Sequence, residues 1–335
     1  MTQHPAPEPC LIALDWGTSA QRAWLLGAGG RILDARRSGA GLLSTSAGID
    51  LTDPAARARG HEAAFLTLVG DWLRAHPGLP AIACGMVGSA RGWQEAEYRT
   101  VPCPLTFGAD DLTPVSHREG LLHLVPGLRV APDPARMIPG DVLRGEETQA
   151  IGILAQLPDP DAAQTLVLPG THSKWLRIHD REVTGFTTAM SGELYALVTE
   201  HGILGHTATT PVRDDAAFAR GLAASANPAA RGLAAELFGA RALVLAGALA
   251  SSALPDYVSG VIIGDEVCRL LPHYREPGRI TLCGSADLCR RYATALEYRD
   301  IAAEIIGEDV AAQGLWAIAC TAGLVGSAQA AGQQS

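Results

Sequence analysis

The sequence predicts an α/β protein built from two similar domains, and three observations lead to this class. Residues 10–26 and 165–178 each contain an apolar strand, a Gly-Thr turn and a second apolar strand. Segments with apolar residues at helical spacing, such as residues 54–75, alternate with these strands. The 335 residues suffice for two full cores. The repeated hairpin therefore indicates two similar domains, each offering a phosphate-binding turn to a shared cleft.

The first hairpin carries residues suited to phosphate chemistry. Asp15 follows an apolar strand, and Gly17, Thr18 and Ser19 precede the next one at residues 22–26. A carboxylate at a strand end can hold Mg²⁺, and a glycine lets backbone N–H groups approach an oxyanion without a Cβ in the way. The alternative is an ordinary hairpin in which Asp15 only caps the turn.

The second hairpin carries the only lysine of the chain. Gly170 and Thr171 form its turn, His172 follows, and Lys174 stands beside a tryptophan. Of the 26 basic residues, 25 are arginines. A lysine is a compact point charge that can reach a phosphoryl oxygen where a planar guanidinium does not fit. We therefore expect Lys174 to meet a phosphate; the alternative is chance placement.

Composition and charge exclude several classes of partner. The net charge of −9 argues against nucleic acid or an anionic membrane, because both need a concentrated basic face. No apolar run is long enough to span a membrane, and the N-terminus lacks the features of a signal peptide. The seven cysteines form no C-x-x-C pair and predict reduced, mostly buried thiols. We expect a cytoplasmic protein that holds any anionic substrate through local groups.

The first half continues with a third strand at residues 31–36, the helix at 54–75 and a buried strand at 81–84. The buried strand runs into a glycine-bracketed loop at residues 85–89, with Trp93 close behind. Open α/β sheets bind ligands at such strand ends. The alternative is a plain strand-to-helix turn.

Two adjacent glutamates begin a predicted helix in the segment RGEETQ. Glu146 and Glu147 precede an Ala- and Ile-rich stretch that extends through Leu157. A glutamate at a helix start beside a cleft can accept the proton of an attacking hydroxyl, which makes both residues candidates for a catalytic base. The alternative is structural, because acids in the first turn are favourable for the helix dipole.

A linker with two prolines follows at residues 158–161. We therefore expect an N-terminal domain at residues 1–157 and a C-terminal domain at residues 162–335. An Ala-rich segment predicts a final helix at residues 310–323.

The second domain offers further candidates at predicted element ends. A loop at residues 187–192 leads into a helix with Glu193 in its first turn. Gly264 is expected where a strand or helix ends. Gly284 and Ser285 follow an apolar strand and open a helix whose N-terminus could hold a nucleotide.

Three common motifs are absent, namely G-x-x-x-x-G-K-[ST], G-x-G-x-x-G and G-x-S-x-G. From about Leu11 to Gly323, however, the chain resembles the 2-dehydro-3-deoxygalactonokinase family, sugar-acid kinases of the actin and hexokinase superfamily. Six segments carry the resemblance in this order: LDWGTSAQRAW, GMVGSARGW, RGEETQ, LPGTHSKW, MSGELYALV and LCGSADLCRRY. Each is weak alone, but six in sequence are specific.

The resemblance implies two ribonuclease-H-like (actin-like ATPase) domains flanking a nucleotide cleft, with ATP and Mg²⁺ as cofactors. The implied reaction transfers the γ-phosphoryl group to the 6-hydroxyl of 2-dehydro-3-deoxy-D-galactonate in galactonate breakdown. By position, the first phosphate motif falls on Asp15, Gly17 and Thr18, the second on Gly170, Thr171 and Lys174, and the adenosine region on Gly284 and Ser285.

The second phosphate motif departs from the superfamily pattern. Pro169 precedes its glycine, where the superfamily often carries an acid, so the position of the catalytic base is open. The segment RGEETQ also looks like the glutamate-bearing segment of exopolyphosphatases in the same superfamily. That similarity favours Glu146 or Glu147 as the base.

Other candidates complete the expected site. For contact with the sugar acid they are Arg22, Met86, Gly88, Ser89, Trp93 and Glu193. For contact with phosphate or nucleotide they are also Ser19, His172 and Gly264. Two rival functions remain, a phosphohydrolase of the same fold and an ATP-driven conformational switch. The sequence also permits a homodimer.

Overall fold

The computed structural model describes residues 8–50, 52–137, 139–227, 229, 231–274, 278–307 and 309–326. It divides into two compact units. Unit 1 comprises Met1–Pro160, Arg181–Val183 and Asp309–Ser335, and unit 2 comprises Asp161–Asp180 and Thr184–Glu308. The expectation that the N-terminus is no signal peptide concerns the first seven residues, which lie outside the described part.

Unit 1 is built on a sheet with the strand order β3-β2-β1-β4-β8-β7. Its strands are β1 (Pro9–Trp16), β2 (Gln21–Gly27), β3 (Ile32–Ser38), β4 (Ala81–Gly85), β7 (Thr113–His117) and β8 (Gly120–Leu124). β2 runs antiparallel to both β1 and β3, β4 runs parallel to β1, and β8 runs parallel to β4. The apolar runs of β1 and β4 are buried because these strands lie in the middle of the sheet.

A smaller sheet and four helices complete unit 1. The sheet contains β5 (Tyr98–Thr100), β9 (Gly127–Val130) and β10 (Asp141–Leu143). The helices are α1 (Leu42–Thr45), α2 (Pro54–Ala75), α3 (Glu146–Leu154) and α9 (Val310–Thr321). Asp53 caps α2 by accepting a hydrogen bond from the N–H of Ala55, and Pro54 suits the first helical position. The apolar face of α2, including Phe65 and Trp72, packs in the core with β1 and β4.

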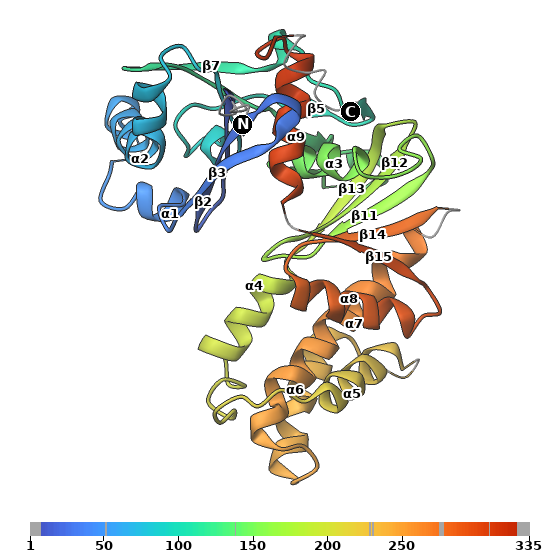
Figure 1. Ribbon diagram of the computed structural model, residues 1–335. Coiled ribbons are helices and arrows are strands. Elements are labelled where there is room, and N and C mark those ends of the chain that lie inside the picture. Colours follow the sequence, from blue (N-terminus) through green and yellow to red (C-terminus); the bar gives the residue numbers. More distant parts are fainter. Residues whose placement is uncertain are drawn as a thin grey trace, which may run out of the picture. The chain divides into compact units, whose positions relative to one another are not determined.

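The last helix, α9, belongs to unit 1, where it packs on α3, β1 and β4 (Figure 1). Glycines bring α3 and α9 close together. A Cβ at Gly152 would lie 1.9 Å from the carbonyl oxygen of Val310, and one at Gly314 would lie 2.0 Å from that of Thr148. The structure thus differs from the expected domain at residues 162–335, because this packing joins segments far apart in sequence.

Unit 2 repeats the topology of unit 1, with the strand order β15-β14-β11-β12-β13. The strands are β11 (Gln164–Leu168), β12 (Ser173–His179), β13 (Glu182–Ala189), β14 (Arg279–Cys283) and β15 (Ala303–Ile306). β11 runs antiparallel to β12 and parallel to β14, and β15 runs parallel to β14. β6 (Cys103–Pro104) pairs with Glu182 and Val183, at the start of β13, which group with unit 1. The predicted α/β class with two ribonuclease-H-like units is confirmed.

The helices of unit 2 are α4 (Ser191–Ala196), α5 (Asp215–Ala226), α6 (Leu233–Leu245), α7 (Leu254–Tyr274) and α8 (Ala286–Glu297). α7 is the central helix of this group and packs against α5, α6 and α8. Gly264 lies inside α7, not at the end of an element as expected. A Cβ there would lie 2.1 Å from Ser225 Oγ, so its small size serves the contact between α5 and α7.

Several other expectations meet the structure here. The helix expected to run through Leu157 ends at Leu154. The expected loop at residues 187–192 is partly strand, because β13 continues to Ala189. All seven cysteines are free and five are buried, as predicted. Within the described residues, no helix is both long and apolar enough to cross a membrane.

Candidate active site

Asp15 lies near the end of β1, directly opposite Arg22 of β2. Arg22 Nη2 donates to Asp15 Oδ2 at 2.6 Å, and the two side chains are only 20% and 15% exposed. The other carboxylate oxygen, Oδ1, lies 3.9 Å from the Sγ atom of Cys84 at the end of β4. Asp15 therefore lies within β1, one residue before its end. We had expected it after the strand, in the turn.

The turn that follows presents hydroxyl groups. The N–H of Gly17 donates to the carbonyl of Ala20 at 2.9 Å, so this amide is used within the turn. Thr18 and Ser19 are exposed. The turn is supported by the start of α1, whose Leu42 N–H donates to the carbonyl of Gly17 at 3.0 Å.

Two glycines with positive φ bring the ends of β4 and β10 close to Asp15. Gly85 has φ 89°, and a Cβ there would lie 2.7 Å from the carbonyl oxygen of Trp16 and 3.3 Å from Asp15 Oδ1. Gly145 has φ 107°, and a Cβ there would lie 3.2 Å from Gly85 Cα. Both positions require glycine, because side chains are strained at these φ values and the space is filled. The start of α3 is thus placed beside the end of β1.

Glu146 and Glu147 occupy different environments at the start of α3. Glu146 is partly exposed, and its Oε2 accepts a hydrogen bond from the N–H of Arg144 at 3.0 Å. Glu147 is fully buried; its Oε2 accepts from the N–H of Gly145 at 2.6 Å, and its Oε1 from Thr148 Oγ1 at 3.0 Å. Burial, assisted by the charge of Glu146, raises the pKa of Glu147 to about 8. Only Glu146 therefore keeps a carboxylate that solvent reaches.

The loop after β4 contains a 3₁₀ helix, Met86–Gly88, and its side chains are largely engaged. The hydroxyl of Ser89 donates to the carbonyl of Met86 at 2.7 Å. Gly88 packs against Arg144, since a Cβ there would lie 3.0 Å from Arg144 Nη1. Trp93, expected to contact substrate, is instead buried in the core against Trp16 and other apolar side chains. Its large apolar ring is better explained by that packing.

In unit 2, Lys174 lies in β12, opposite Leu168 of β11. It therefore follows the turn rather than lying within it. The lysine is only 5% exposed, and its Nζ donates to the carbonyl of His172 at 3.0 Å. The ammonium group is thus held close to the backbone of the Gly-Thr turn.

The start of α4 packs directly on this turn. The N–H of Glu193 donates to the carbonyl of Thr171 at 2.9 Å, and a Cβ at Gly192 would lie 2.3 Å from the carbonyl oxygen of Gly170. His172 Nε2 lies 2.5 Å from Glu193 Oε2. The structure therefore brings Glu193, a candidate for substrate contact, together with the candidates for phosphate contact.

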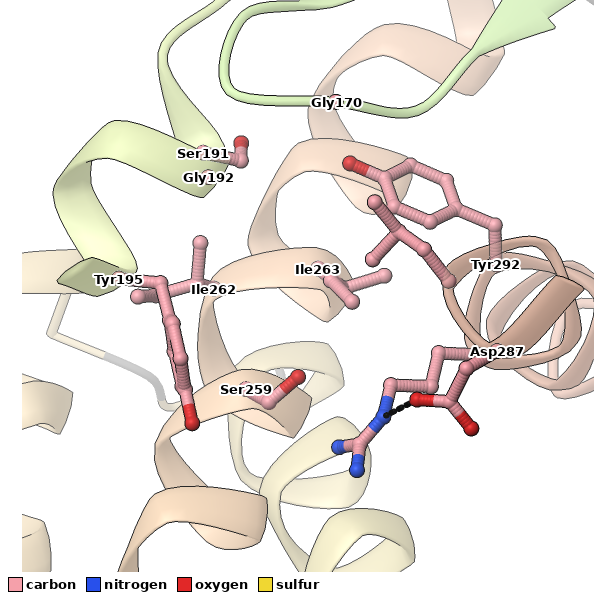
Figure 2. A pocket seen from close by; sticks show the side chains of 11 residues that line it. Gly170, Ser191, Gly192, Tyr195, Ser259, Ile262, Ile263, Asp287 and Tyr292 are labelled. Atoms are coloured by element: carbon pink, nitrogen blue, oxygen red, sulfur yellow. Dashed lines mark ion pairs between the residues drawn. The ribbon is translucent and has the colours of Figure 1, made fainter. Parts of the chain in front are cut away.

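A cavity of about 230 Å³ lies beside this turn, within unit 2 (Figure 2). Gly170, Ser191 and Gly192 form one end, and Ile262 and Ile263 of α7 supply an apolar side. The remaining lining residues come from α4, α7 and α8, and they are Tyr195, Ser259, Asp287, Leu288, Arg291 and Tyr292. An apolar wall with a few polar groups is typical of a small-molecule site.

Gly284 and Ser285 lie at the end of β14, where α8 begins. A Cβ at Gly284 would lie 2.9 Å from the carbonyl oxygen of Pro169, so this strand end is close to the turn of the second hairpin. Ser285 is the N-cap residue of α8, and Asp287 in the first turn lines the cavity. Arg291, one turn later, lies 3.6 Å from the Asp287 carboxylate.

Sequence reasoning missed most residues of the cavity, including Ser191, Tyr195, Asp287, Arg291 and Tyr292. These five residues come from α4 and α8, and they lie in two of the segments that carry the resemblance, MSGELYALV and LCGSADLCRRY. The position of these segments after apolar strands indicates where the strands end, but it does not show which helix residues face a cavity.

No metal cluster is evident from side chains alone, since the described residues contain no group of three or more His, Cys, Asp or Glu that could hold an ion. Mg²⁺, however, is usually bound by one or two carboxylates together with substrate phosphates. Asp15 fits that requirement, because a thiol at 3.9 Å is the one hydrogen-bond contact of its Oδ1 among the described residues. Asp15, near the end of β1, and Glu146, at the start of α3, are the carboxylates that this site offers.

Comparisons with known proteins agree with this architecture. A family model described as 2-keto-3-deoxy-galactonokinase matches residues 15–318. A probable 2-dehydro-3-deoxygalactonokinase from Rhizobium meliloti is 36% identical over 306 residues, covering 89% of this chain and 92% of that protein. The 2-dehydro-3-deoxygalactonokinase of Escherichia coli is 32% identical over 304 residues, covering 90% and 94%.

A solved structure is also similar. The crystal structure of a 2-dehydro-3-deoxygalactonokinase-like protein from Sinorhizobium meliloti has a TM-score of 0.77 and 33% identity, covering 92% of this chain and 95% of that one. Fold and matches together define a phosphotransferase of the sugar-kinase class. The chain belongs to the 2-keto-3-deoxy-galactonokinase family.

Proposed function

We propose that the protein is an ATP-dependent kinase that phosphorylates the 6-hydroxyl of 2-dehydro-3-deoxy-D-galactonate. The observation that carries this proposal is membership of the family over residues 15–318, which include both Gly-Thr hairpins and the cavity of unit 2. The relatives named above carry this substrate in their names. Phosphoryl transfer demands positioning and charge neutralisation more than covalent chemistry, and the two hairpins suit those tasks.

In unit 2, the nucleotide occupies the cavity and the second hairpin holds its phosphates. Ile262 and Ile263 offer an apolar surface of the kind that a purine ring needs. Gly170 lines one end of the cavity, where the phosphate chain extends, and the Lys174 ammonium is bonded to the carbonyl of His172 close to the same turn. A compact ammonium suits a phosphoryl oxygen in this confined position.

In unit 1, Asp15 and Glu146 perform different tasks. Asp15 holds Mg²⁺, which when bound offsets phosphate charge, and Arg22 fixes the orientation of its carboxylate at 2.6 Å. Glu146 is the base that accepts the proton of the sugar hydroxyl, because its carboxylate is partly exposed. Glu147 instead supports the start of α3, since both of its oxygens accept hydrogen bonds within the protein. Met86 and Ser89 remain candidates for contact with the sugar acid.

The proposal is tested by following conversion of ATP to ADP across a panel of 2-keto-3-deoxy sugar acids. We expect turnover with 2-dehydro-3-deoxy-D-galactonate and a phosphate ester at carbon 6, identified by phosphorus and carbon NMR. ADP formation that does not depend on any sugar acid would instead indicate a phosphohydrolase. A phosphate ester at another carbon would contradict the proposed acceptor.

A further inference from the structure

Glu266 of α7 is a buried carboxylate on which three side chains converge. It is 5% exposed, and its Oε1 accepts a hydrogen bond from Trp175 Nε1 at 2.7 Å. Its Oε2 accepts from Tyr292 OH at 2.7 Å and from the hydroxyl of Ser191. These donors come from β12, α8 and α4, so one side chain connects α7 to three neighbouring elements.

The chemistry of the groups sets the direction of each bond. An indole N–H can only donate and a carboxylate can only accept, whereas a hydroxyl has one proton and two lone pairs. Because the Tyr292 proton is used by Glu266, the hydroxyl of Ser173, 2.7 Å away, must donate to Tyr292. Burial raises the pKa of Glu266, and the hydrogen bonds from Ser191, Trp175 and Tyr292 act in the opposite direction. The three donors thus match an ionised carboxylate.

Two of these donors, Ser191 and Tyr292, line the cavity together with Gly170 (Figure 2). The proton of Ser191 is directed to Glu266, which leaves only its lone pairs for a ligand. We propose that Glu266 is a positioning residue that fixes the hydrogen-bond direction of the nucleotide pocket, so that Ser191 acts there only as an acceptor. This inference rests on the proposed function, because it takes the cavity as the site of ATP.

The inference specifies the chemistry of the ligand at this point. The group that meets Ser191 must carry a proton, and ATP offers three such groups, the two ribose hydroxyls and the amino group of adenine. Removal of that group should weaken binding, because the lone pairs of Ser191 would then lose their donor. The nucleotide analogues 2′-deoxy-ATP, 3′-deoxy-ATP and ITP each remove one of the three.

Glu266→Gln tests the direction of the bonds while keeping the size of the side chain. The indole N–H of Trp175 can only donate, so the new glutamine must keep its amide oxygen toward Trp175. The NH₂ group of the glutamine then faces Ser191 and Tyr292. Ser191 would accept from the NH₂ group, and its proton would turn toward the cavity and oppose the donor of the ligand. We expect Glu266→Gln to weaken ATP binding about tenfold, a change typical of one lost hydrogen bond.

The decisive experiment is a double-mutant cycle on the dissociation constant of ATP, measured by calorimetry. Ser191→Ala should also weaken binding about tenfold, and the double variant Ser191→Ala/Glu266→Gln should be no weaker than Ser191→Ala. The KM for ATP should rise in parallel, while kcat at saturating ATP changes by less than about twofold. Additive losses in the cycle would contradict action through Ser191.

Thr165→Val is a matched control for general destabilisation. Thr165 is buried in β11, and its hydroxyl donates to the carbonyl of Tyr274 at 3.0 Å, outside the cavity. This variant should lower thermal stability and leave ATP affinity unchanged. If Glu266→Gln does not fold, the nucleotide analogues measured on the wild type and Ser191→Ala test the inference without it.

The analogues separate this inference from the proposed function. Failure of the wild-type protein to bind ATP would refute the nucleotide site itself. If ATP binds, one of the three analogues should bind the wild type about tenfold more weakly than ATP does. The same analogue and ATP should bind Ser191→Ala with equal affinity. Equal binding of all three analogues and ATP to the wild type would overturn the inference and leave the proposed function intact.

Discussion

The two hairpins differ at one matched position, which lies two residues before the glycine of each turn. There the first hairpin pairs Asp15 with Arg22, and the second pairs Leu168 with Lys174. Five strands of the two sheets around them follow the same order, β3-β2-β1-β4-β8 in unit 1 and β13-β12-β11-β14-β15 in unit 2. Unit 1 thus places a carboxylate and its counter-charge at this position, and unit 2 places a cation opposite an apolar residue. In the proposed function the same backbone arrangement serves two purposes, a cation site in one hairpin and a phosphate site in the other.

Removal of the carboxylate from the first hairpin should have the largest effect. Asp15→Asn should lower kcat by about 10³-fold, because the amide cannot replace the charge that organises Mg²⁺. Circular dichroism should show an unchanged fold. Asp71→Asn is the matched control, since Asp71 forms a surface ion pair with Arg36 in the same unit. Near-normal activity of Asp15→Asn in limiting Mg²⁺ would reduce Asp15 to a structural residue.

The two glutamates of α3 should respond unequally, although they are adjacent. Glu146→Gln should lower kcat by about 10²-fold with a smaller change in the KM for ATP, as expected for loss of a general base. Glu147→Gln should lower kcat by less than about tenfold, because its side chain has no exposed surface for a substrate. Parallel steady-state measurements decide between them. Small and equal effects would move the role elsewhere, with Asp141 the next residue to test.

Lys174 tests whether the second hairpin needs a point charge. Lys174→Arg should lower kcat by about 10²-fold, because the larger planar group would displace the phosphate from its line of transfer. The 5% exposure of Lys174 leaves little room for a guanidinium. Arg177→Lys is the control, as Arg177 lies exposed in the same strand. A fully active Lys174→Arg would show that any cation suffices.

The last prediction concerns stability and its dependence on pH. The pKa of Glu147 is about 8 in the folded protein, against an ordinary value of 4.5. Below pH 4.5, Glu147 is protonated in both the folded and the unfolded protein. Between that value and about pH 8, Glu147 releases its proton only in the unfolded protein, so the free energy of unfolding falls as pH rises. Urea unfolding at about pH 5 and about pH 8 should show this loss in the wild type and a much smaller one in Glu147→Gln. Equal pH dependence would contradict a buried, protonated Glu147.

Local patterns were sufficient to predict most elements of the fold. The helix expected at residues 54–75 agrees with α2, because its apolar spacing and the breaker His76-Pro77-Gly78 lie in one continuous segment. The hairpins were recognisable for the same reason. The placement of α9 could not be predicted, since its contact with α3 depends on glycines more than 150 residues apart. Single-sequence patterns carry no information about such partners.

The candidate site was predicted in part. Asp15, the Glu146–Glu147 pair and Lys174 could be proposed because a turn, a helix start and the lone lysine are local signals, and their roles stay predictions. Trp93 was proposed to contact the substrate and packs in the core, because a tryptophan near a strand end can face either the ligand or the core, and only packing decides between them. The network around Glu266 could not be predicted, because four separate elements supply its members.

The most direct test of the division between the hairpins is the affinity for ATP without Mg²⁺, measured by calorimetry in EDTA for the wild type, Asp15→Asn and Lys174→Met. If the first hairpin serves the cation and the second the phosphates, Asp15→Asn should bind ATP as the wild type does. Lys174→Met should bind about tenfold more weakly, through loss of one charge-assisted contact. Equal weakening by both variants, or none by Lys174→Met, would contradict the account.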